Sequence, residues 1–84
     1  MTNIECIRQA LKVVGASFNS YPCFVTRQNH MCSYTFNSNR PSNHLANMIR
    51  DELRNYFGDK LLDCYFIIKK NLQDSVFVIK VTAV

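Results

Sequence analysis

The feature that most constrains the fold is an apolar stripe between residues 45 and 57. Apolar side chains recur there at spacings of three and four, at Leu45, Met48, Ile49, Leu53 and Phe57. This spacing places them on one side of an α-helix, while charged and amide side chains occupy the other side. Ser42 or Asn43 can cap the start of this helix, and Gly58 can end it.

A second stripe of the same kind lies near the start of the chain. Its apolar members are Ile4, Ile7, Leu11 and Val14. They predict a helix over residues 3–14, with Thr2 or Asn3 as the N-cap and Gly15 at the C-terminal end. Each predicted helix therefore has one apolar side that must be covered by another part of the chain.

Four further segments are rich in β-branched and aromatic residues and predict strands. They span residues 22–27, 31–36, 61–70 and 75–83. The connections at residues 27–30 and 71–74 are short, so each pair of strands forms an antiparallel hairpin. Pro22 cannot donate to a ladder, which favours an edge position for the first strand. Residues 16–21 and 37–44 are polar connections.

The predicted order is α-β-β-α-β-β, which indicates an α+β fold. The chain has 84 residues, enough for a single domain that spans residues 1–84. The economical arrangement is a two-layer sandwich, with a four-stranded antiparallel sheet and two helices on one face. Several strand orders satisfy this description.

Alternation along the last two strands divides their side chains between two faces. The sets predicted to meet the helices are Leu62, Cys64, Phe66 and Ile68, and Phe77, Ile79, Val81 and Ala83. The other face carries Tyr65, Ile67, Val76 and Val78, joined by Met31, with Lys69 and Lys80 at one end. A solvated face is usually polar, so this mixture indicates either a contact surface or the β-propensity of Val and Ile alone.

The leading functional hypothesis is a non-enzymatic protein that binds a partner protein, or a second copy of itself, through the open sheet face or an edge strand. It predicts that Val78→Asp leaves the domain folded and abolishes the complex. Short chains without motifs also include accessory inhibitors of the phage or mobile-element kind, which dock on a host complex.

The distribution of charge supports an alternative partner. Residues 1–50 carry five basic residues and one acid, 5 − 1 = +4, whereas residues 51–84 are neutral. The excess either keeps the protein in solution or attracts an anionic partner such as nucleic acid. In the second case Arg27, His30, Arg40 and His44 form a phosphate site, provided that their two loops converge. Tyr34 and Phe36 are then either stacking surfaces or core residues.

No pattern in the chain specifies an enzyme, a cofactor, a metal site or a small-molecule substrate. Cys6, Cys23, Cys32 and Cys64 lack the close pairing of zinc ligands. Cys23 or Cys32 with His30 or His44 is a weak match to a cysteine nucleophile and its base. The first residues lack the apolar run of a secretory signal, and no apolar stretch is long enough to span a membrane. We therefore expect a cytoplasmic protein with reduced thiols.

Overall fold

The computed structural model describes residues 2–15, 19–38, 40–71 and 74–82, the side chains of residues 19–24 excepted. Its elements are α1 (Asn3–Val13), β1 (Asn19–Gln28), β2 (Met31–Ser38), α2 (Asn43–Phe57), the short 3-10 helix η1 (Gly58–Lys60), β3 (Leu61–Ile67) and β4 (Ser75–Thr82). The predicted α-β-β-α-β-β order is confirmed.

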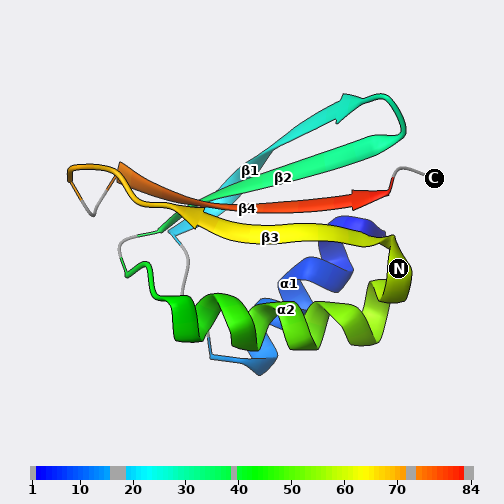
Figure 1. Cartoon of the computed structure of the whole chain (residues 1–84), viewed down its shortest axis with the longest axis horizontal. Helices are drawn as coiled ribbons and strands as arrows, with labels where there is room; N and C mark the ends of the chain where they lie inside the picture. The colour runs from blue at the N-terminus through cyan, green and yellow to red at the C-terminus, as the bar shows by residue number, and fades with distance from the viewer. Residues whose placement is uncertain (1, 16–18, 39, 72–73, 83–84) are drawn as a thin grey trace.

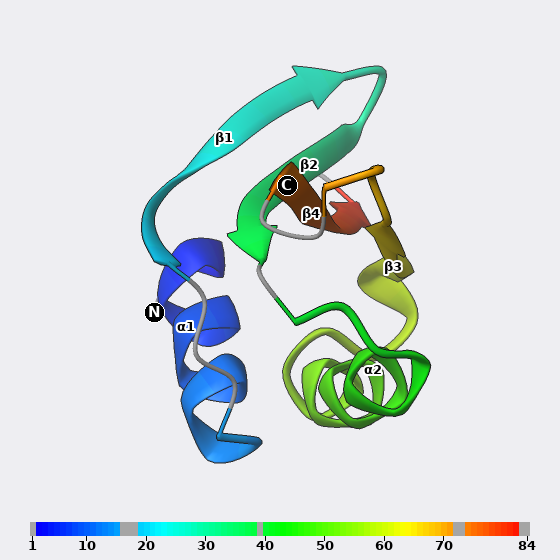
Figure 2. The same ribbon diagram turned by 90° about the vertical axis from the view of Figure 1, so that its left-hand side faces the viewer.

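The four strands form one antiparallel sheet in the order β1-β2-β4-β3. Figures 1 and 2 show α1 and α2 side by side below this sheet, on the same face. α2 contacts β3 and α1. The predicted two-layer sandwich is therefore present, and β1, the strand with Pro22, lies at an edge as expected.

Both helices begin at the predicted caps and α2 ends at the predicted Gly58, whereas α1 ends at Val13 with Val14 as its C-cap, one residue earlier than predicted. The hydroxyl of Thr2 accepts a hydrogen bond from the amide of Glu5, and the hydroxyl of Ser42 accepts one from the amide of Leu45. The distance between nitrogen and oxygen is 3.3 Å in each bond. Gly58 ends α2 with a φ of 54°, a left-handed conformation that costs glycine little. These caps satisfy backbone donors that a helix leaves unpaired.

The core fills the space between the helices and the lower face of the sheet. Its fully buried members include Ile7, Ile49, Leu53, Phe77, Ile79 and Val81. Phe66 packs against Phe77 with ring centroids 4.4 Å apart. Tyr34 and Phe36 are also buried, so both aromatic side chains belong to the core.

One part of the predicted alternation is wrong. Leu62 and Ile68 were assigned to the core face, but they are 53% and 60% exposed. The register shifts between Leu61 and Asp63, so that Leu61 takes the place opposite Val81 and Leu62 becomes an extra residue in a bulge. Ile68 lies beyond the end of β3. The prediction for Ala83 falls outside the described residues.

The β1–β2 hairpin is longer and tighter than predicted. β1 begins at Asn19, within the expected connection, and its register with β2 shifts between Asn19 and Phe24. Only Asn29 and His30 form the turn, with φ values of 48° and 63°. Two successive positive φ values are the signature of a type I′ turn, which matches the twist of the two strands.

Candidate functional site

The open face of the sheet is the first candidate, because both helices lie on the other face (Figure 2). The register aligns Val78 with Tyr65 and Val76 with Ile67, and places Lys80 opposite Asp63. We call five of these residues the sheet-face patch: Tyr65, Ile67, Val76, Val78 and Lys80. The neighbouring strand β2 contributes Ser33, Thr35 and Asn37 to the same face. Apolar side chains therefore gather over β3 and β4 and polar ones over β2, where the half-buried Met31 beside Thr82 is the apolar exception.

The exposure of the patch is uneven. Ile67 is 43% exposed, and Tyr65 and Val76 are half-buried. Val78 is only 6% exposed, because it lies between Thr35 on β2 and Tyr65 on β3. Ile67 is thus the apolar side chain of the patch that is most accessible to a partner, whereas Val78 contributes little exposed surface.

The prediction that Lys69 and Lys80 lie at one end of this face is wrong, because the register places Lys80 opposite Asp63 and Lys69 beyond Ile67, at the other end. The Nζ atom of Lys80 lies 5.5 Å from the ring centroid of Tyr65, within the range of a cation–π contact. Lys69 is exposed, and its amide donates to the hydroxyl of the fully buried Ser75 over 3.1 Å. This bond ties the segment after β3 to the first residue of β4.

The predicted phosphate site is not assembled. Arg27 and His30 lie at the hairpin end of β2, whereas Arg40 and His44 follow its other end. The length of β2 separates the two pairs by roughly 23 Å, at about 3.3 Å per residue. All four side chains are exposed, but the convergence that the alternative required is absent. The burial of Tyr34 and Phe36 also removes them as stacking surfaces.

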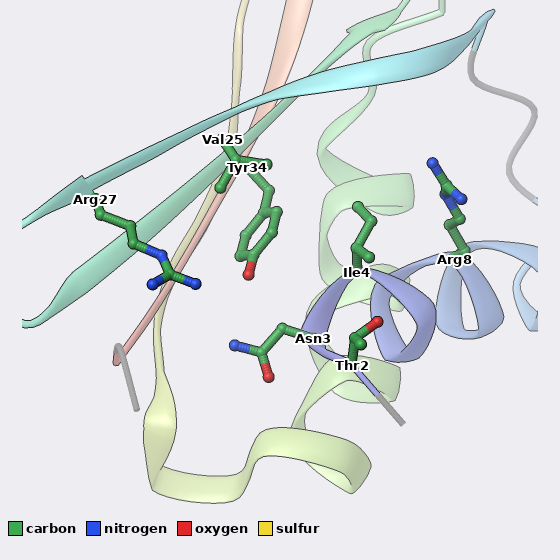
Figure 3. Close-up of a pocket in the computed structure, with 7 residues that line it drawn as sticks. All are labelled: Thr2, Asn3, Ile4, Arg8, Val25, Arg27 and Tyr34. Carbon is green, nitrogen blue, oxygen red and sulfur yellow. The ribbon is translucent and has the colours of Figure 1, made fainter.

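Sequence reasoning missed a cleft of about 420 Å³ between the start of α1 and the β1–β2 hairpin. Its lining includes Asn3, Ile4, Arg8, Val25, Arg27 and Tyr34 (Figure 3). The hydroxyl of Tyr34 points towards the side chain of Asn3. Burial raises the pKa of Tyr34, so this hydroxyl stays protonated. No periodic pattern links residues of α1 with residues of β1, so only the tertiary structure reveals this cleft.

The described cysteines are packing residues. Cys6, Cys32 and Cys64 are free thiols, and the side chain of Cys23 lies outside the described part of the chain. Burial raises the pKa of Cys64 to about 12, which removes it as a thiolate nucleophile near neutral pH. Among the described residues, no group of three His, Cys, Asp or Glu side chains is placed to hold a metal ion.

We expect Cys64 to resist alkylation while the protein is folded. Its thiol is fully buried and protonated, and the thiolate is the reactive form. Treatment with iodoacetamide at mildly alkaline pH, followed by peptide mass spectrometry, should find Cys64 unmodified in the native protein and fully modified in urea. Equal modification in both conditions would show that the β3–β4 region opens readily.

Within the described residues, neither helix has the length and apolar character needed to cross a membrane. The chain matches no known protein family, no curated protein sequence and no solved structure.

Proposed function

We propose that the chain is a non-enzymatic binding protein that docks a partner protein on the sheet-face patch. The observation that supports this most is the apolar half of the open face, which none of the described helices covers. A monomeric protein usually keeps such a face polar, as β2 does here with Ser33, Thr35 and Asn37. The patch has apolar side chains between Lys80 at one end and the exposed Ile67 at the other, which resembles the apolar core and polar rim of an interface.

The charge of the surface favours an acidic partner over a second copy of the chain. The chain carries a net charge of +4, so two copies repel each other. Lys69 and Lys80 flank the patch and would meet carboxylates on the rim of the partner. Docking of this kind occludes a surface of the partner, which is how a small accessory inhibitor acts. The free thiols of Cys6, Cys32 and Cys64 suit a reducing compartment such as the cytoplasm.

The substitution Ile67→Asp tests the proposal. Ile67 is exposed enough to accept a carboxylate without unfolding the domain, and it is the most exposed apolar side chain of the proposed contact, next to Val76. An apolar side chain that the partner buries fully contributes about 2 kcal/mol or more, and a carboxylate there would also lose its hydration, so we expect at least a thirtyfold loss of affinity. The measurement compares proteins captured from a cell lysate by the wild type and the variant, with titration of each captured protein by calorimetry.

Val13→Asp is the matched control, because Val13 is 55% exposed, against 43% for Ile67, and lies on α1 in the other layer. The proposal requires an acidic protein that binds the wild type and Val13→Asp but not Ile67→Asp. Equal binding to all three forms would exclude the sheet-face patch. Analytical ultracentrifugation of the purified chain tests self-association, and a dimer broken by Ile67→Asp would assign the patch to a second copy instead.

A further inference from the structure

The two edges of the sheet differ in how their backbone groups are satisfied. At the β3 edge, the carboxylate of Asp63 accepts a hydrogen bond of 2.8 Å from the amide of Cys64. Arg50 of α2 donates a hydrogen bond to the carbonyl of Cys64. These bonds occupy groups that a docking strand would need. Proteins commonly protect edge strands in this manner, because an open edge recruits other chains.

The β1 edge lacks this protection beyond Pro22. In a two-residue hairpin the residues beside the turn exchange both hydrogen bonds, and bonded pairs alternate with unbonded ones from there. Gln28 and Met31 form the first bonded pair, so the amides and carbonyls of Arg27 and Val25 point away from β2. Among the described residues, no group bonds these outward amides and carbonyls.

The cleft between α1 and the hairpin lies beside this open segment. Val25 is 51% exposed and, with Ile4 and Tyr34, provides an apolar lining. Arg27 and Arg8 stand at the two ends of the cleft in the view of Figure 3. No carboxylate belongs to the described lining, and the hydroxyl of Thr2 already caps α1. The positive charge of the cleft therefore comes from guanidinium groups.

We propose that β1 binds an extended acidic peptide segment of a partner protein by strand addition along residues 24–28. The backbone of the segment pairs with the outward amides and carbonyls of Val25 and Arg27. Alternate side chains of an added strand point to the same face of the sheet, so every second one enters the cleft. A carboxylate at one of those positions meets Arg27, while apolar atoms of the segment contact Val25.

The surroundings favour a peptide over nucleic acid. An outward amide and carbonyl on the same residue match the backbone of another strand, whereas a phosphodiester chain offers acceptors but no donors. Nucleic-acid surfaces also carry dense Lys and Arg, and the cleft has two arginines around an apolar floor. This site uses the edge opposite β3 and does not depend on the sheet-face patch.

The test uses a fluorescein-labelled synthetic peptide in which glutamate and valine alternate, followed by fluorescence anisotropy. We expect Arg27→Glu to weaken binding at least about tenfold, because a hydrogen bond to a charged group contributes roughly 1.5–3 kcal/mol. Arg40→Glu is the matched control, since it makes the same change of charge at the far end of β2. Far-UV circular dichroism confirms that both variants fold. In ¹⁵N spectra, the amides of Val25 and Arg27 should shift on titration.

Two modified probes separate strand addition from simple attraction of charge. The same peptide with N-methylated amides keeps its carboxylates but loses its backbone donors, and we expect it not to bind. An oligothymidine strand should bind more weakly than the peptide. Absence of peptide binding, equal weakening by Arg27→Glu and Arg40→Glu, retained binding of the methylated peptide, or tighter binding of oligothymidine would each overturn the proposal. Ile67→Asp should leave peptide binding unchanged, so this site and the sheet-face patch succeed or fail separately.

Discussion

Replacing Phe77 with alanine is expected to remove a large share of the stability of the protein. Phe77 is fully buried at the centre of β4 and packs against Phe66. Removal of a buried phenyl ring lowers the free energy of unfolding by about 3–5 kcal/mol, whereas the whole free energy of unfolding of a domain of this length is about 4–13 kcal/mol. Urea unfolding followed by circular dichroism should show a midpoint at much lower denaturant and an unchanged slope.

Val13→Ala provides the control for Phe77→Ala. Val13 is exposed at the end of α1, so its truncation should change the free energy of unfolding by no more than about 0.5 kcal/mol. If Phe77→Ala and Val13→Ala unfolded at the same urea concentration, the packing of Phe77 against Phe66 would not be the centre of the core.

Val78→Asp is expected to destabilise the fold, in contrast to what the sequence alone suggests. Val78 lies on the open face, but Thr35 and Tyr65 cover it from both sides. A carboxylate at that position loses most of its hydration, and an uncompensated buried charge costs about 3–5 kcal/mol. Ile67→Asp introduces the same charge on the same face at an exposed position. Urea unfolding should therefore separate the two variants clearly.

The pH dependence of Val78→Asp provides an independent check. Burial raises the pKa of a carboxyl group in the folded state above its unfolded value of about 3.9. The folded protein then binds more protons than the unfolded protein, so the deficit relative to the wild type should shrink as the pH falls through the raised pKa. A deficit that stays constant across this range would indicate a steric cause instead of an electrostatic one.

The helices and the class of fold could be predicted because their signals are local. The spacing of Ile49 and Leu53 determines which side of α2 is buried, and Ser42 and Gly58 mark its ends. Each hairpin follows from a short connection between two apolar segments. Such patterns depend only on neighbours along the chain, so a single sequence contains them.

The arrangement of the strands could not be predicted in the same way. The order β1-β2-β4-β3 results from contacts between segments that are distant in the sequence. The bulge at Leu62 places Leu61, and not Leu62, opposite Val81. The faces of Tyr65, Ile67 and Val78 were assigned correctly, but their exposure depends on neighbouring strands. The cleft depends on α1 and β1 together, which explains why Arg8 and Arg27 were not paired from sequence.

The hydrogen bonds of Arg50 and Asp63 to Cys64 also limit how copies of the protein can assemble. An open-ended sheet of many subunits requires each subunit to expose two edge strands, one that pairs with the preceding subunit and one that pairs with the next. Here the amide and carbonyl of Cys64 on the β3 edge are bonded to side chains of the same molecule. Continued growth through β3 would first have to break these two bonds, which disfavours the head-to-tail ribbons from which fibrils form.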